Sequence, residues 1–155
     1  MQIQKNGYGC GLYAVANALK LENFVTEERL EQSKNGIGNG KLNQYLLEDG
    51  KNIFIDVLYC DTQVNSLPEN WCSLYSEDID KQLPILIQCV INGRFHLMGA
   101  ILTNEEGKIT LFDSLNTEPI VCTLSDINKM YDKVHALYSF NYIDTTEYYA
   151  MTNGI

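Results

Sequence analysis

The order of the periodic patterns predicts an α+β fold, with helices before residue 50 and an antiparallel sheet after them. Residues 12–19 place apolar side chains at the three- and four-residue spacing of a buried helix face. From residue 53 onward the chain instead carries short apolar runs typical of strands. Turn signals at 92–93 and 106–107 separate the later runs, as in consecutive hairpins. Helices followed by antiparallel strands are typical of an α+β domain.

Three helices are expected in the first part of the chain. The first begins at or near Cys10. Thr26 is a candidate N-cap for a short second helix, because acidic residues follow it directly. The glycine-rich stretch 35–40 is interpreted as a plain loop, since no strand precedes it and no Gly-Lys-Ser/Thr ends it. A third helix is expected over 41–48, with its inward face made of Leu42, Tyr45 and Leu46.

Strands are expected in most of the remaining chain. Their predicted ranges are 53–59, 84–91, 95–103, 108–113 and 134–142. The stretch 67–75, which holds Trp71, is ambiguous, and 77–82 fits a short helix or a turn. A small helix is predicted over 124–131, with Ser125 near its cap.

The composition describes one domain, expected over residues 1–143, and a polar, aromatic tail over 144–155 with the character of a poorly ordered terminus. The net charge of -9 argues against nucleic acid or an anionic membrane as the main partner, because both attract basic surfaces. No apolar run is long enough to span a bilayer, and no signal-peptide pattern opens the chain. A reducing, cytoplasmic location is therefore expected, with export by a signal-less route left open. The oligomeric state is not predicted.

The five cysteines fit neither a disulfide framework nor a zinc ribbon, because their number is odd, their spacing is wide and no C-x-x-C pair occurs. No metal and no cofactor are expected. Four of the cysteines lie in apolar or strand-like surroundings and are interpreted as small core residues: Cys60, Cys72, Cys89 and Cys122.

Cys10 is the exception, and we expect it to be a nucleophile. It lies between Gly9 and Gly11 at a helix start, where unpaired N–H groups and the helix dipole favour a thiolate. Gln4 could supply an amide donor to the oxyanion formed during acyl transfer, together with the Cys10 backbone N–H. Gln2 is the alternative donor, although it is farther from Cys10.

A base and an orienting acid are expected from two neighbouring strands. His96 and His135 are the only histidines. If 95–103 and 108–113 pair through the turn between them, Asp113 returns almost opposite His96, with Cβ atoms about 5 Å apart. Asn116 is a second candidate for the orienting role. The spacing thus predicts a Cys-His-Asp triad.

The order Gln4, Cys10, His96, Asp113 resembles that of the papain-like cysteine peptidases in the broad sense. The small members it resembles are the C39-type peptidases, which process double-glycine leaders, and the Josephin-type deubiquitinases. The resemblance implies a papain-like fold and a thiol protease that cleaves a peptide or isopeptide bond, with Gln4 in the oxyanion hole. It also implies a protein or peptide substrate, such as a ubiquitin-like or double-glycine tail.

The local sequence motifs are similar to those of the adenain-type ubiquitin-like proteases. Their cysteine motif resembles Gln4-x-x-Gly7-Tyr8-Gly9-Cys10-Gly11-x-Tyr13, and their other motifs resemble His96-Leu97 and Phe112-Asp113-Ser114-Leu115-Asn116. In those enzymes the catalytic residues follow one another along the chain in the order His, Asp, Gln, Cys. The likeness therefore requires a circular permutation. Two positions depart from the motifs of that family. Gly9 stands where an acidic residue often precedes the cysteine, and Leu97 stands where a Trp usually follows the histidine.

Two alternatives remain open for the function. The same triad serves acyl transfer to an amine or deamidation, and the fold could also persist as a binding module without activity. Glycines beside the nucleophile favour a narrow cleft that accepts small residues, such as Gly, before the scissile bond.

Overall fold

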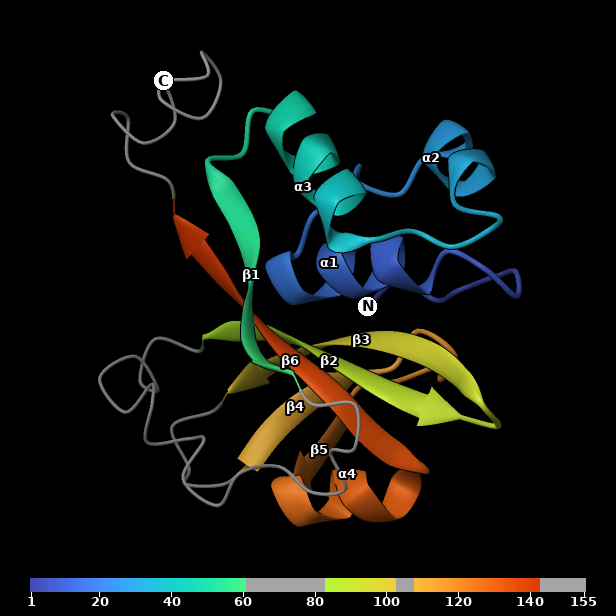
Figure 1. Ribbon diagram of the computed structural model, residues 1–155, viewed down its shortest axis with the longest axis vertical. Coiled ribbons are helices and arrows are strands. Elements are labelled where there is room, and N and C mark those ends of the chain that lie inside the picture. The colour runs from blue at the N-terminus through green and yellow to red at the C-terminus, as the bar shows by residue number, and fades with distance from the viewer. Residues whose placement is uncertain (61–82, 103–107, 143–155) are drawn as a thin grey trace.

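The computed structural model describes residues 1–60, 83–102 and 108–142. Helices α1 to α3 lie on one face of a six-stranded antiparallel sheet, and α4 packs near its other face (Figure 1). The predicted α+β class is confirmed, with helices first and the sheet after them.

The three N-terminal helices are α1 (Cys10–Leu19), α2 (Glu27–Gln32) and α3 (Asn39–Glu48). All three were predicted, and α3 begins two residues earlier than expected. Thr26 caps α2 as predicted, because its side chain accepts a hydrogen bond from the Arg29 N–H at 3.1 Å. The glycine-rich connection between α2 and α3 contains no helix or strand before Asn39.

Six strands form one sheet in the order β1-β6-β2-β3-β4-β5. Their bounds are β1 Ile53–Cys60, β2 Pro84–Ile91, β3 Arg94–Leu102, β4 Lys108–Phe112, β5 Ile120–Thr123 and β6 Lys133–Tyr142. The last strand therefore lies inside the sheet, between β1 and β2. Asn92 and Gly93 both have positive φ in the β2–β3 turn, which confirms the predicted hairpin.

Several details differ from the sequence-based expectations. Strand β5 was not predicted. Helix α4 (Leu124–Met130) is capped by Thr123, which forms a capping box with Asp126, rather than by Ser125. The stretches 67–75 and 77–82, the 106–107 turn signal and the 144–155 tail lie outside the described residues.

The register between β3 and β4 is also shifted from the expected one. Leu102 pairs with Ile109, and the pairing ends at Gly99 opposite Phe112. Continued by one step, this register sets Asp113 beside Met98 instead of His96. Asp113 and His96 are therefore diagonal neighbours rather than facing partners, which still allows long side chains to meet.

Helix α1 is pressed closely against β3. A Cβ atom on Gly99 would lie 2.5 Å from the Ala14 carbonyl oxygen and 3.0 Å from the Ala18 Cβ. Only glycine permits this approach, so Gly99 sets the distance between α1, which begins at Cys10, and the sheet. Within the described ranges, no helix is both long and apolar enough to cross a membrane.

Candidate active site

Cys10 is the first residue of α1, and it is only partly exposed. The chain enters the helix through Gly9 at φ 90°, where a Cβ atom would also lie 2.6 Å from Leu30 Cδ2. No described side chain caps this helix start. The first N–H groups of α1 thus remain available beside the sulfur, and they and the helix dipole favour negative charge there.

His96 lies on β3 where that strand has a neighbour on one side only. It is paired with Cys89 of β2, whereas β4 pairs with β3 only from Gly99 onward. The imidazole is buried, and its Nε2 lies 2.8 Å from Oδ1 of Asp113. His96 also forms a hydrogen bond with the Cys10 thiol, which we assign to Nδ1 because Nε2 is bonded to Asp113.

Asp113 follows β4 directly and is held by three donors. Oδ1 accepts from His96 and from the Leu115 backbone N–H at 3.0 Å, and Oδ2 accepts from the Tyr131 hydroxyl at 2.8 Å. The carboxylate is buried and has a partner on each oxygen. The predicted neighbours Cys10, His96 and Asp113 are therefore brought together in one row of contacts.

Tyr131 belongs to this group, although no sequence pattern predicted it. It lies at the C-terminal end of α4, far along the chain from the glycine-cysteine motif. Burial and the nearby Asp113 charge raise the pKa of Tyr131, so its hydroxyl stays a neutral donor. The position of Tyr131 depends on where α4 ends relative to the sheet, and no local sequence pattern predicts that position.

The three groups change one another's ionisation. Burial opposes ionisation of Cys10, but hydrogen bonds from His96 and the Leu97 backbone outweigh it and lower the pKa of the thiol. Burial also opposes charge on His96, yet the bonds and charges of Asp113 and Cys10 raise its pKa to about 9. Bonds from His96, Leu115 and Tyr131 likewise overcome burial and lower the pKa of Asp113. The favoured state is a thiolate beside an imidazolium.

The other described cysteine side chains behave in the opposite way. Burial, with a contribution from the Asp113 charge, raises the pKa of Cys89 to about 12. Burial raises the pKa of Cys122 to about 11. Both are buried in the second core cluster, as predicted for structural cysteines. The side chains of Cys60 and Cys72 lie outside the described part of the protein.

Gln4 is tied to the turn that carries the acid. Its backbone N–H donates to the Ser114 carbonyl at 2.7 Å, and the Ser114 hydroxyl donates to its Oε1 at 2.9 Å. Its Nε2 donates to the Asn6 carbonyl at 2.7 Å, which leaves the second amide hydrogen unused by that bond. Gln4 is not among the described residues that line the cavity beside Cys10.

The alternative site residues lie elsewhere or in other roles. Gln2 bonds to Asn17 and to the Leu21 carbonyl, at the far end of α1 from Cys10. Asn116 is exposed, and its N–H donates to the Asp113 carbonyl in the turn after β4. The ring centroid of His135 lies 4.8 Å from that of Phe95, and no described contact joins His135 to Cys10 or Asp113.

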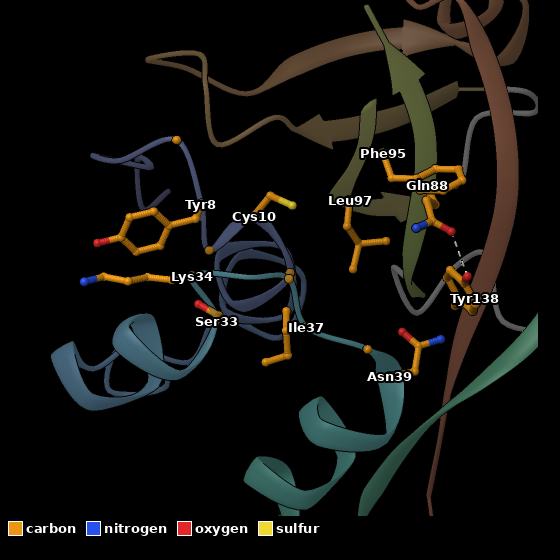
Figure 2. Close-up of a pocket in the computed structure, with 15 residues that line it drawn as sticks. Tyr8, Cys10, Ser33, Lys34, Ile37, Asn39, Gln88, Phe95, Leu97 and Tyr138 are labelled. Carbon is orange, nitrogen blue, oxygen red and sulfur yellow. Dashed lines mark hydrogen bonds between the residues drawn. The ribbon is translucent and has the colours of Figure 1, made fainter. Parts of the chain in front are cut away.

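A cavity of about 430 Å³ opens beside the sulfur of Cys10. Figure 2 shows the start of α1 and the 33–39 loop on one side of it, and side chains of the sheet on the other. Its sheet side is lined by Gln88, Phe95, Leu97 and Tyr138. The cleft therefore lies between the helical layer and the sheet, with the candidate nucleophile at its edge.

Within 1–60, 83–102 and 108–142, no cluster of three or more His, Cys, Asp or Glu residues could hold a metal ion. No protein-family model matches the sequence, and no curated protein matches it.

Proposed function

We propose that this protein is a papain-like cysteine peptidase in which Cys10 is the nucleophile, His96 the base and Asp113 the orienting acid. One observation carries the proposal: His96 is buried between Cys10 and Asp113, with a lowered pKa on the thiol and a raised pKa on the imidazole. A thiolate paired with an imidazolium is the reactive form of a cysteine nucleophile.

The reaction follows from the roles of these groups. The Cys10 thiolate attacks the carbonyl carbon of an amide, and the oxyanion forms beside the Cys10 N–H and the Gln4 side chain. His96 then gives its proton to the leaving amine. Water, deprotonated by His96, attacks the thioester and releases the carboxylic acid, and the proton returns to the site. Asp113 keeps Nδ1 of His96 directed at the sulfur by holding Nε2.

Gln4 is the proposed second oxyanion donor, since its bond to the Asn6 carbonyl leaves one amide hydrogen unused. Ser114 holds Oε1 of Gln4, so the amide nitrogen is turned away from the acid-bearing turn. Because Ser114 follows Asp113 directly, the acid and the oxyanion donor are fixed by one turn. A papain-like arrangement is further supported by the nucleophile at a helix start packed against the strand that carries the base.

The substrate is proposed to be a protein or peptide with small residues before the scissile bond. Three glycines of the start of the chain line the cavity: Gly7, Gly9 and Gly11. Without side chains there, a main chain can pass close to Cys10, and a glycine-rich tail fits that approach.

The proposal is tested by comparing wild type with Cys10→Ala and Cys10→Ser. Each protein is incubated with internally quenched peptides and with a probe ending in a Gly-Gly electrophile, and intact masses are recorded. We expect cleavage and labelling by wild type, with product formation abolished in both variants and circular dichroism unchanged. Cleavage by Cys10→Ala at the wild-type rate would refute the mechanism. A substrate shifted by +1 Da, or cross-linked but uncut, would point to deamidation or amine transfer instead.

A further inference from the structure

Gln88 places an amide on the sheet side of the cavity. It lies on β2 directly opposite Leu97 of β3, the residue that follows His96. Both side chains line the cavity that contains Cys10, and Figure 2 shows Gln88 and Leu97 on the wall facing the start of α1. A substrate held at Cys10 would therefore pass close to this amide.

The orientation of the Gln88 amide is fixed by Tyr138. The Tyr138 hydroxyl donates to Oε1 of Gln88 at 2.9 Å, and Tyr138 itself is buried in β6. With Oε1 held, Nε2 turns toward the cavity (Figure 2). Among the described residues, no acceptor is bonded to this nitrogen. The wall thus presents the N–H groups of the Gln88 amide, to which no described residue is bonded as an acceptor.

The rest of the lining favours the same kind of ligand. In a chain with a net charge of -9, no Asp or Glu of the described part lines the cavity. Lys34 lines its outer end, where its amine is 2.8 Å from a Glu31 oxygen outside the lining, and Asn39 adds a second amide. The walls between them include the apolar side chains of Ile37 and Leu97. The described lining therefore combines apolar contacts and hydrogen-bond donors, and it contains no carboxylate.

We propose that the cavity is a specificity subsite for a substrate side chain that ends in an acceptor oxygen, a carboxylate or a carboxamide. Gln88 is the donor that recognises this oxygen, Tyr138 is the residue that orients Gln88, and the apolar walls contact the methylene groups of the substrate. The inference rests on the proposed function, because the cavity serves a peptide only if the bond attacked by Cys10 lies beside it.

The test uses peptidyl chloromethyl ketones that alkylate Cys10 with loss of chloride. One variable residue, Glu, Gln, norleucine or Lys, is placed in turn at each of three positions before the ketone. The second-order rate of Cys10 alkylation is measured by intact-protein mass spectrometry. At one position we expect Glu and Gln to react about tenfold faster than norleucine, as a hydrogen bond of about 1.4 kcal/mol gives.

Variants at position 88 assign the preference to its donor. Gln88→Leu is expected to remove the preference, and Gln88→Glu to reverse it in favour of Lys. Tyr138→Phe frees the Gln88 carbonyl to turn inward and should narrow the advantage of Glu over Lys. Gln44→Leu, the same substitution on the exposed side of α3, is the matched control and should keep the wild-type order. An unchanged order in Gln88→Leu, or no preference in wild type, would overturn the subsite.

Alkylation by iodoacetamide tests the proposed peptidase function separately from the subsite. It reads the intrinsic reactivity of Cys10 without using the cavity wall. If Cys10 reacts no faster than Cys89 and Cys122, the peptidase proposal fails and the subsite fails with it. If Cys10 is reactive but the ratios do not depend on Gln88, only the subsite is wrong.

Discussion

The Tyr131 hydroxyl lies 2.8 Å from Oδ2 of Asp113 and holds the side of the carboxylate that faces away from His96. Oδ1 is occupied by His96 and by the Leu115 N–H. With donors on both oxygens, the carboxylate is prevented from rotating away from the imidazole. Tyr131 therefore acts on Cys10 only through Asp113 and His96, as a positioning residue.

Tyr131→Phe should weaken the contact between Asp113 and His96 without removing the ring that packs in the core. Loss of a hydrogen bond to a buried carboxylate is expected to lower the free energy of unfolding by about 1.5–3 kcal/mol at pH 7. The pKa of Asp113 is lowered in the folded protein, so its contribution to stability is present above its unfolded pKa and is lost as pH falls through the folded one. Removing one donor raises that folded pKa, so the loss on acidification should begin at a higher pH. Urea unfolding from pH 3 to pH 7 measures both effects; a wild-type acid limit in the variant would contradict this role.

Gly99→Ala should be among the most damaging small substitutions in the protein. The new methyl group would meet the Ala14 carbonyl at 2.5 Å and force α1 away from β3. Overpacking of this kind lowers the free energy of unfolding by about 1–3 kcal/mol or more. Since α1 carries Cys10 and β3 carries His96, alkylation of Cys10 should slow as well.

Gly40→Ala is the matched control for this change. Gly40 lies in α3, and nothing is within 4 Å of a Cβ atom built on it. Alanine in an exposed helical position is expected to raise the free energy of unfolding by about 0.5–1 kcal/mol. Chemical denaturation of both variants beside wild type should give shifts of opposite sign, and equal shifts would show that the close approach at Gly99 is not limiting.

Arg29→Lys tests how the 33–39 wall of the cavity is supported. Arg29 joins α2 to α3 through two bonds to Asp49, of 2.6 and 2.9 Å, and its guanidinium lies 4.6 Å from the ring centroid of Tyr45. Lysine keeps the charge but loses the two-pronged geometry and the flat stacking. We expect the free energy of unfolding to fall by about 1–2 kcal/mol. Faster proteolysis between α2 and α3 in the variant would agree, whereas unchanged unfolding and proteolysis would show that Arg29 is not the support.

Local patterns explain how much of this fold could be anticipated. The helical spacing from Leu12, the Thr26 cap and the Asn92-Gly93 turn act over a few residues, and each leads to the observed element. The proximity of His96 and Asp113 was also predictable, because it needs only one hairpin, although its register is shifted. Strand β5 was missed because its four residues follow a turn and are too short to show alternation.

Long-range placement was not predictable from such patterns. The insertion of β6 between β1 and β2 depends on pairing between distant segments, and it brings Tyr138 beside Gln88. Likewise, Tyr131 reaches Asp113 only because α4 ends beside that turn. The sequence therefore predicted the three central residues of the site, while the side chains that orient them depend on tertiary packing.

Cys10 should be alkylated by iodoacetamide at pH 6, where ordinary thiols, with pKa values of about 8.5, are almost fully protonated. His96 and the Leu97 N–H hold the pKa of Cys10 below its usual value. His96→Gln removes the larger of these two contributions, so the rate at pH 6 is expected to fall about 10- to 100-fold. Cys89 and Cys122 serve as internal references in peptide maps of the same samples. Equal labelling of all three in wild type would exclude an activated thiol.

Between pH 6.5 and pH 9, the stability of the wild-type protein should combine two contributions of opposite sign, one from His96 and one from Cys10. The pKa of His96 is raised from 6.5 to about 9, so its contribution is present below 6.5 and is lost as pH rises through about 9. The pKa of Cys10 is lowered from 9.0, so its contribution is present above 9.0 and is lost as pH falls through the folded value. Cys10→Ala leaves only the His96 contribution, still supported by Asp113. The free energy of unfolding of that variant, measured with urea at each pH, should therefore fall as pH rises across the same window, and a flat profile would show that Asp113 alone does not raise the pKa of His96.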